Sequence, residues 1–252
     1  MLFIENRLII LCRHEKFGDG IRIMHVSDIH KDRKGADNCR ISETAEKKSP
    51  DMIFITGDLI SRSETDFKSA EILLNRLCEV APVYMVFGNH EQSIDEKYMP
   101  ELEKMLENTK VQLLNNCGEY IQIKNRKFCI CGVVPKYTAY KKNDSYRNPD
   151  NFTSKDMTEL MGAKPYGNIL LLAHNPLWAD VYAEWGADYT FSGHVHGGAV
   201  RIFGKGVLSP ERKLFPKYSK GVYTVGEMKL CVSGGIGKLR LFNPPEIVFY
   251  EL

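Results

Sequence analysis

Five of the seven histidines lie in short polar clusters, and each cluster follows an apolar run of the chain. The clusters supply carboxylate, amide and imidazole groups, the side chains that bind metal ions. In chain order they are Asp28-x-His30, Gly57-Asp58, Gly88-Asn89-His90-Glu91, His174-Asn175-Pro176 and Gly193-His194-Val195-His196. These residue types, drawn from five separate places, predict a hydrolase site built on two metal ions.

The chemistry of such a site assigns a special role to Asp58. Two cations about 3.5–4 Å apart can hold a bridging hydroxide and clamp both the attacked phosphorus and the leaving oxygen. One ligand must then touch both cations, and a carboxylate can bridge where an imidazole cannot. Asp58 is the natural bridging ligand because its cluster contains no histidine. The histidine-rich remainder favours first-row metals over magnesium or calcium, so we expect two divalent cations of Mn, Zn or Fe.

The apolar runs that precede the clusters predict buried strands. Three of them lead directly to a candidate ligand: residues 21–27 to Asp28, residues 52–56 to Asp58, and residues 83–87 to Asn89. Continuous apolar runs of this length are typical of parallel strands covered on both faces. Each strand would deliver its ligand at its carboxyl end, which is where open α/β sheets place their sites.

Helical spacing of apolar residues alternates with these strands, at residues 37–49, 64–79 and 99–106, where Pro100 suits a first turn. Further strands are expected at residues 127–133, 169–173, 189–192, 222–225 and 229–233, with fewer helices between them. The pattern predicts an α/β fold in which a second sheet packs on the first and helices lie outside.

The five clusters resemble the signature of the calcineurin-like metallophosphoesterases, which reads D-x-H, G-D, G-N-H-[DE], a lone His and G-H-x-H. The chain matches this signature in order and without a missing ligand. The resemblance covers nearly the whole chain. It implies the four-layer α/β/β/α metallophosphatase fold, in which two mixed sheets form a sandwich flanked by helices.

Carried over residue by residue, the resemblance implies two ligand sets that share one carboxylate. One cation would be held by Asp28, His30, Asp58 and His196, and the other by Asp58, Asn89, His174 and His194. His90 stays outside the metal shell, because the matching histidine of the family faces the substrate phosphate. There it would stabilise negative charge or protonate the leaving oxygen. His90 and Asp58 are thus the expected catalytic residues, and Asn89 and His90 the expected substrate contacts.

The C-terminal third resembles one bacterial branch of that family, at residues 215–218, 221, 223, 233–237 and 240–246. The branch contains small phosphohydrolases, including enzymes that cleave the pyrophosphate of UDP-diacylglucosamine. One position departs from its pattern. An arginine usually follows the serine that matches Ser233, and Gly234 stands there in this chain.

Selection of a substrate must come from the walls of the site, because the cations only neutralise phosphate charge. Residues 135–151 and 197–220 mix aromatic residues with lysines, and we interpret the first segment as a loop that covers the site. Such walls suit a flat or apolar group beside a second negative charge, and the residues concerned are Tyr137, Tyr140, Tyr146, Lys136, Lys141 and Lys142. They favour a phosphodiester or pyrophosphate of a small or lipid-linked compound.

Length and charge agree with one enzyme domain. A chain of 252 residues falls within the range of single domains, so residues 1–252 are expected to form one phosphoesterase domain. The net charge of +2 gives no sign of a dedicated nucleic-acid binder. A nuclease or a phosphomonoesterase on the same scaffold remains an alternative. A binding module that has lost catalysis is a weaker one, because every ligand of the signature is present.

The cysteines and the first residues favour a cytoplasmic protein, with peripheral contact to a membrane left open. Seven cysteines without paired spacing indicate reduced thiols, and Cys129-x-Cys131 has the spacing of a strand that packs into a core. Residues 5–7 interrupt the apolar start of the chain, which argues against a secretory signal. Residues 8–12 are too short to span a bilayer and are expected to form an edge strand. His14 and His25 are expected to be core or surface residues.

Overall fold

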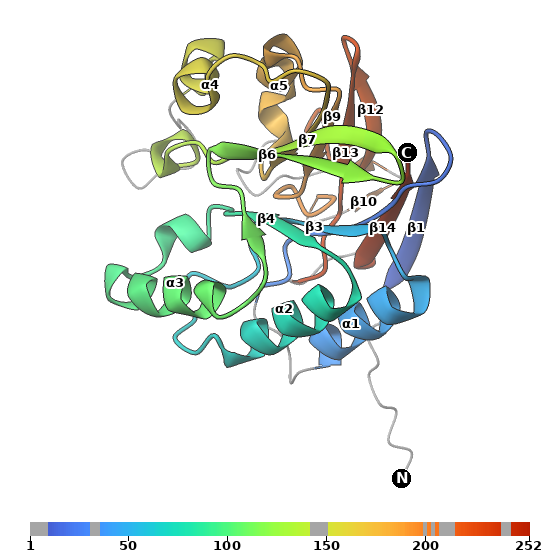
Figure 1. The fold of residues 1–252 in the computed structure, drawn as a ribbon. Helices are drawn as coiled ribbons and strands as arrows, with labels where there is room; N and C mark the ends of the chain where they lie inside the picture. Colours follow the sequence, from blue (N-terminus) through green and yellow to red (C-terminus); the bar gives the residue numbers. More distant parts are fainter. Residues whose placement is uncertain are drawn as a thin grey trace.

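Two six-stranded sheets lie face to face, and helices cover the outer face of each (Figure 1). The computed structural model describes residues 10–30, 36–141, 151–198, 201–202, 205–206, 215–237 and 243–252. One outer face carries α1 (Ala36–Lys48), α2 (Lys68–Val80) and α3 (Met99–Glu107), and the other carries α4 (Ser154–Met161) and α5 (Ala179–Trp185). The predicted α/β/β/α sandwich is confirmed.

The first sheet is built around four parallel strands. Its members are β1 (Leu11–Lys16), β2 (Arg22–Val26), β3 (Met52–Thr56), β4 (Val83–Val86), β5 (Gln112–Leu113) and β14 (Glu246–Glu251). The order is β1-β14-β2-β3-β4-β5, and β2 to β5 run parallel. The last strand, β14, lies antiparallel to β2 and parallel to β1, so the two ends of the described chain complete this sheet.

The second sheet repeats the parallel arrangement. Its members are β6 (Cys117–Ile123), β7 (Arg126–Val133), β8 (Asn168–Ala173), β9 (Tyr189–Ser192), β12 (Gly221–Val225) and β13 (Met228–Val232). The order is β12-β13-β9-β8-β7-β6, with only the edge strands β6 and β12 antiparallel to their neighbours. Smaller elements are the ribbon β10 (Arg201–Ile202) and β11 (Lys205–Gly206) and the 3-10 turns η1 (Glu91–Ser93), η2 (Glu96–Tyr98), η3 (Tyr137–Ala139) and η4 (Pro176–Trp178).

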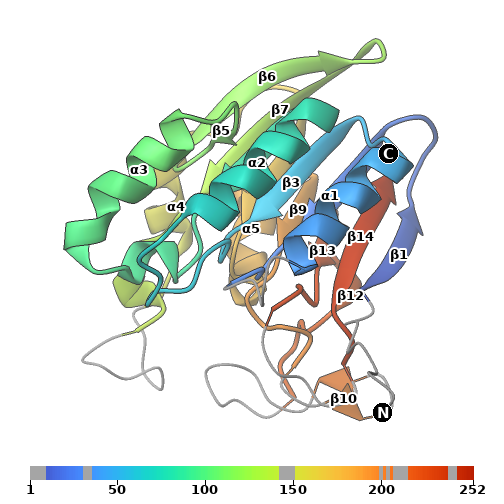
Figure 2. The same cartoon turned by 90° about the horizontal axis from the view of Figure 1, so that it is seen from below.

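Three hydrophobic layers hold the sandwich together. Side chains alternate along each strand, so Phe54 of β3 and Leu170 of β8 meet between the sheets. Ile53 of β3 packs instead against the α1 to α3 layer, which lies over the first sheet in Figure 2. On the other side, Leu171 and the predicted core residue Cys129 pack with α4 and α5. The central strands of both sheets are therefore buried on both faces, which is why they read as continuous apolar runs.

Some element boundaries differ from the sequence predictions. Helix α2 begins at Lys68 and not at residue 64, because Asp66 Oδ1 accepts a hydrogen bond from Lys68 N at 2.9 Å and Phe67 turns into the core. The edge strand expected at residues 8–12 is β1, which begins at Leu11, and residues 1–9 lie outside the described residues. Helix α4 and strands β5, β6 and β14 were not predicted.

The helices are short compared with a bilayer. α1 and α2 have 13 residues each, whereas a membrane-spanning helix needs about 20 apolar residues. Among the described residues, none of the helices has the length and apolar character that a membrane crossing requires.

Candidate metal centre

The predicted ligands meet where strand ends of both sheets converge. Asp28 follows β2, Asp58 follows β3 and Asn89 follows β4, while His174 and His194 follow β8 and β9 of the second sheet. These strands are parallel within each sheet, so their carboxyl ends share one edge. All five residues are buried, with at most 5% of their surface exposed. Several charged and polar groups buried this close together need a compensating ion or hydrogen bonds.

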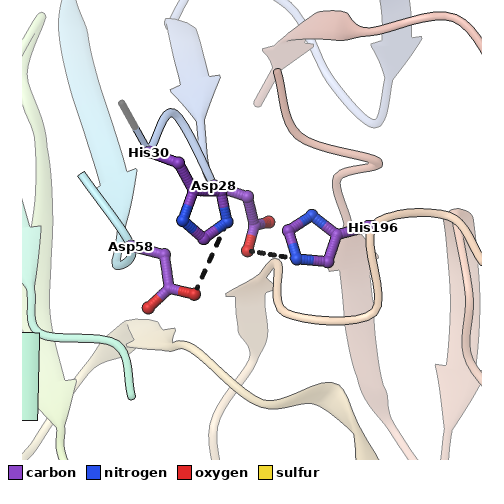
Figure 3. Close-up of side chains that lie close together, drawn as sticks. All are labelled: Asp28, His30, Asp58 and His196. Atoms are coloured by element: carbon purple, nitrogen blue, oxygen red, sulfur yellow. Dashed lines mark ion pairs between the residues drawn. The ribbon is translucent and has the colours of Figure 1, made fainter. Parts of the chain in front are cut away.

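Four side chains surround one possible cation position (Figure 3). Asp28, His30, Asp58 and His196 each offer one ligand atom, and these four atoms lie within 4.8 Å of one another. The Nε2 atom of His30 is 3.8 Å from Asp58 Oδ2, and the Nε2 atom of His196 is 3.8 Å from Asp28 Oδ1. Such separations are too long for hydrogen bonds, but they suit two ligands that each lie about 2.0–2.2 Å from the same metal ion.

A second group of ligand atoms surrounds His174. The Nε2 atom of His174 lies 3.4 Å from Asp58 Oδ2, 3.1 Å from Asn89 Oδ1 and 3.2 Å from His194 Nδ1. Asp58 Oδ2 is therefore the atom that faces both groups. Its partner Oδ1 accepts a hydrogen bond from His90 N at 2.8 Å, which fixes the orientation of the carboxylate.

The hydrogen bonding of His174 shows that a cation fits this second position. Its Nδ1 atom is 2.7 Å from the carbonyl oxygen of Thr56, which can only accept, so Nδ1 carries the proton of the neutral ring. The lone pair on Nε2 then points at the electron-rich atoms of Asp58, Asn89 and His194. A positive charge among these atoms would turn their mutual repulsion into attraction. The donor set, imidazole with carboxylate and amide oxygen, suits a transition metal.

The charges of the two groups are strongly linked. Burial alone would raise the pKa of Asp58, but His174, His90 and His30 hold that pKa well below its usual range. Burial would likewise lower the pKa of His174, yet the charges of Asp58 and Asp28 raise it to about 9. The buried carboxylates therefore favour a positive charge beside His174.

The backbone of the site is held in a rarely used conformation. Among the described residues, ten non-glycine residues have positive φ angles, and half of them belong to this site: Asp28, His30, Asp58, His194 and His196, with φ between 51° and 66°. Each such residue costs about 1–2 kcal/mol relative to an ordinary conformation. Strain of this kind is stored at functional sites, where the surrounding structure overrides it.

Two glycines permit the close approach of these loops. A Cβ atom on Gly88 would lie 2.3 Å from Asp58 Oδ1, and one on Gly193 would lie 1.8 Å from Ser27 Oγ. No side chain fits at either position. The glycines explain how carboxylates from one sheet reach histidines from the other.

His90 lies beside both groups but has a different orientation. Its Nδ1 atom accepts a hydrogen bond from Arg62 N at 3.0 Å, so the neutral ring carries its proton on Nε2. That Nε2 atom is 3.9 Å from Asp58 Oδ2. His90 therefore presents a hydrogen-bond donor toward the centre, whereas His174 presents a lone pair.

Glu91 supports the centre through hydrogen bonds to the backbone of two of its loops. The side chain is completely buried, and its Oε2 atom accepts hydrogen bonds from Asp58 N at 2.9 Å and Gly88 N at 2.8 Å. Its Oε1 atom accepts from Ile60 N at 3.1 Å. One carboxylate thus joins the loop after β3 to the loop after β4. Burial raises the pKa of Glu91 to about 7, and the charge of Asp58 adds to the effect.

This raised pKa predicts a pH-dependent stability in the metal-free protein. Folded Glu91 holds its proton up to about pH 7, whereas an unfolded glutamate loses it near pH 4.5. Between these values the folded state binds more protons, so the free energy of unfolding falls as the pH rises. The difference in unfolding free energy between wild type and Glu91→Gln, measured by urea titration, should therefore be smaller at pH 7.5 than at pH 5. A difference that grows with pH would refute this assignment, and exposed Glu107→Gln is the control.

The 135–151 segment only partly matches the predicted cover. Tyr140 is buried, with its ring 5.3 Å from that of His194 and 6.2 Å from that of His174, so it packs against the candidate ligands. Lys136 is exposed and Tyr137 is half-buried. Tyr146 and Lys142, also predicted as wall residues, lie outside the described residues, as does much of the 197–220 segment.

Arg62 is a neighbour of the centre that sequence reasoning missed. Its backbone contacts His90, and its Nη1 atom donates to Tyr137 Oη at 3.4 Å. Its position in the loop directly after Asp58 is the signal that could have identified it. His14 and His25 lie outside the site, as predicted. His14 is exposed on β1, and His25 is buried between the sheets, where burial lowers its pKa to about 3.

A four-layer sandwich with carboxylates and imidazoles gathered at its strand ends defines a class of metal-dependent phosphohydrolases. The chain belongs to the calcineurin-like phosphoesterase family, whose model matches residues 21–198. It is accordingly a metal-dependent phosphoesterase.

Individual relatives support this assignment. The phosphodiesterase YaeI of Escherichia coli is 26% identical over 212 residues, which cover 82% of this chain and 72% of the relative. The UDP-2,3-diacylglucosamine pyrophosphatase LpxG of Chlamydia muridarum is 25% identical over 276 residues, with coverages of 90% and 82%. The crystal structure of the phosphopantetheinyl hydrolase PptH of Mycobacterium tuberculosis matches with a TM-score of 0.53 at 13% identity, covering 82% of this chain and 86% of that one. This last likeness shows the fold alone.

Proposed function

We propose that the chain hydrolyses a phosphodiester or pyrophosphate bond of a small or lipid-linked substrate at a centre of two divalent transition-metal ions. The observation that carries the proposal is the position of Asp58 Oδ2. This oxygen faces His30 Nε2 at 3.8 Å on one side and His174 Nε2 at 3.4 Å on the other. A single carboxylate between two sets of imidazoles is the arrangement that a bridged pair of cations requires.

The proposed ligand sets share this carboxylate. One set consists of Asp28, His30, Asp58 and His196, and the other of Asp58, Asn89, His174 and His194. When bound, the cations supply Lewis acidity that neutralises phosphate charge and lowers the pKa of a water molecule. The imidazole-rich sets favour Mn, Zn or Fe over Mg and Ca. All of these ligands except the half-buried His196 are buried, which limits competition from bulk water.

His90 and Asn89 would act on the substrate itself. The proton on His90 Nε2 is available to a phosphate oxygen or to the leaving oxygen, because Nδ1 is occupied by Arg62 N. His90 can therefore stabilise charge or protonate the leaving group. Asn89 Oδ1 lies 3.1 Å from His174 Nε2, where a cation between them would hold both, and Asn89 directly precedes His90, so its amide would also contact the substrate.

Two observations support a substrate that carries more than a bare phosphate. Tyr137 lies beside Arg62, and its chain neighbour Lys136 is exposed, so this segment offers positive charge next to an aromatic ring. Among the relatives, one is named a phosphodiesterase and one a pyrophosphatase of a lipid precursor. A phosphodiester and a substituted pyrophosphate each carry an organic group on both sides of the phosphorus–oxygen bond that breaks.

A paired substrate comparison tests this proposal. We expect kcat/KM for a phosphodiester, such as bis-p-nitrophenyl phosphate, to exceed that for the matched monoester, with a nucleoside diphosphate sugar and short DNA as further substrates. A faster monoester would contradict the diesterase or pyrophosphatase assignment, and preference for DNA would favour the nuclease alternative.

The wall residues should influence this preference without touching the cations. Lys136→Ala is expected to lower kcat/KM by about fivefold for a substrate with a second negative charge, because one partly exposed charge pair contributes up to about 1 kcal/mol. The monoester should be less affected. Lys127→Ala, at the amino end of β7 and far from the strand ends of the site, is the matched control. Equal losses for both substrates would show that Lys136 does not select the substituent.

A further inference from the structure

The segment Asn243–Pro244–Pro245–Glu246, which we name the brace, has no part in the proposed chemistry, yet both of its polar side chains are buried. Asn243 is 2% exposed and Glu246 is 1% exposed. Glu246 is the first residue of β14. Polar groups buried this completely are expected to hold specific partners.

Asn243 fastens the turn that carries His196. Its Nδ2 atom donates hydrogen bonds to the carbonyl oxygens of His196 and, at 3.1 Å, Gly198. A Cβ atom on Gly197 would lie 2.7 Å from the same Nδ2 atom, so the amide fits tightly into the turn. The carbonyls on both sides of Gly197 are thus tied to one side chain.

Glu246 fastens a second loop, residues 233–237. Its Oε1 atom accepts a hydrogen bond from Gly234 N at 2.9 Å, and its backbone N donates to Gly235 O at 3.0 Å. Two bonds of opposite direction fix the loop against the start of β14.

That loop in turn holds Asp28. Ile236 N donates to Ser27 O at 3.2 Å, and Gly237 N donates to Asp28 O at 2.7 Å. A Cβ atom on Gly235 would lie 2.7 Å from Asp28 Cβ, so the loop is in direct contact with the ligand residue. Glu246 therefore reaches Asp28 through a single short loop.

Two positively charged side chains keep the carboxylate of Glu246 ionised, so that it can accept hydrogen bonds. Lys220 Nζ lies 2.8 Å and Arg13 Nε 3.2 Å from Glu246 Oε2. Burial would raise the pKa of Glu246, but the charges of Arg13 and Lys220 lower it. Lys220 also occupies the space beside Gly234, where an added Cβ would lie 3.1 Å from Lys220 Cδ. An ionised carboxylate thus remains available to Gly234 N.

We propose that Asn243 and Glu246 are positioning residues that hold His196 and Asp28 in place for the cation shared by Asp28, His30, Asp58 and His196. This inference rests on the proposed dinuclear centre. The two prolines between them limit the backbone freedom of the segment, so the two anchor points keep a fixed separation. The brace contacts the backbone of His196 directly and that of Asp28 through the loop of residues 233–237. Its link to the second ligand set is more remote, because it passes through His194 N, which donates to the Asp28 carboxylate at 3.0 Å. The brace should therefore act on the first cation much more strongly than on the second.

Two near-isosteric variants test the brace. Asn243→Asp removes the donor from two carbonyl oxygens, and Glu246→Gln retains a carbonyl oxygen for Gly234 N but loses both ion pairs. Asn243→Ala is a second variant that adds no charge. The matched controls are Asn168→Asp, at the exposed amino end of β8, and Glu251→Gln, at the far end of β14.

Calorimetric titration of each metal-free protein with Mn²⁺ gives the first readout. We expect Asn243→Asp to weaken the binding of one of two Mn²⁺ ions by about 10–100-fold, the usual effect of losing a group that orients a ligand, and to change the binding of the other much less. Glu246→Gln should weaken the binding of the same ion, and the control variants should change the binding of neither ion. Equal weakening of both ions, or of none, would overturn the proposal.

Amide hydrogen exchange of the metal-free proteins gives a readout that does not depend on metal. Asn243→Asp and Asn243→Ala should speed exchange at residues 194–198, and Glu246→Gln at residues 233–237. Unchanged exchange in these segments would overturn the proposed role of the brace, whatever the metal titration shows. If the wild type bound a single Mn²⁺, the dinuclear proposal would fail, while the exchange data would still decide whether the brace holds these loops.

Discussion

Asp58→Asn should remove at least one of the two cations and nearly all turnover. The substitution keeps the shape of the side chain but replaces the charged oxygen that faces His30 and His174 with a neutral amide. A neutral group cannot balance two cations, and its nitrogen would point a proton at one of them. Metal content by plasma emission spectrometry and kcat on a phosphodiester measure the two losses.

The control for this prediction is Asp180→Asn, an exposed aspartate paired with Lys217 at 3.3 Å. It should change neither metal content nor turnover. An Asp58→Asn protein that retained two metal ions and a rate near wild type would rule out Asp58 as the bridging ligand.

His90→Ala should lower kcat by about 10²–10⁴, the range of general acid–base catalysis, while metal content stays nearly constant. The reason is that His90 presents a proton on Nε2 toward the centre but lies outside both proposed ligand sets. The loss should be smaller for substrates with activated leaving groups such as p-nitrophenol, because these need little protonation. Steady-state kinetics on paired substrates measure this difference.

His90→Asn separates catalysis from structure. An amide oxygen near the former Nδ1 position can still accept from Arg62 N, so the loop should stay in place while the proton donor is lost. Similar losses for activated and poor leaving groups would indicate charge stabilisation without proton transfer. Loss of metal in either variant would make His90 a ligand and contradict the assignment.

The ligand-bearing strands could be predicted because each one carries two signals. An apolar run such as residues 52–56 is followed closely by a polar ligand such as Asp58. Because the strand is buried on both faces, its apolar residues are not interrupted by polar ones. The metallophosphatase signature then fixed which side chains to expect together. The structure brings all of them to one edge, and their roles as ligands remain predictions.

Other elements were missed although local signals exist. Helix α4 has a capping box, in which Thr153 and Asp156 satisfy each other's backbone donors. Its sequence falls next to a polar, tyrosine-rich stretch, which hid the start of the helix. Strand β14 has four successive buried apolar residues, 247–250, whose insertion between β1 and β2 no local pattern reveals.

The supporting contacts could not be predicted because their partners are far apart in sequence. Arg13 and Glu246 are separated by 233 residues, and Asn243 and His196 by 47. Such pairs depend on the complete fold, because they meet only after β14 has entered the first sheet. Arg62 and Tyr137, which lie 75 residues apart, also meet only in the folded protein. Residue types at strand ends can therefore indicate the chemistry, whereas the side chains that hold them require a structure.

Anomalous diffraction from crystals grown with Mn²⁺ tests the dinuclear centre most directly. Data collected at the manganese absorption edge should show two peaks about 3.5–4 Å apart, one on each side of Asp58 Oδ2. The first should lie among Asp28, His30 and His196, and the second among Asn89, His174 and His194. A single peak at full Mn²⁺ saturation, or two peaks without Asp58 between them, would contradict the proposed centre.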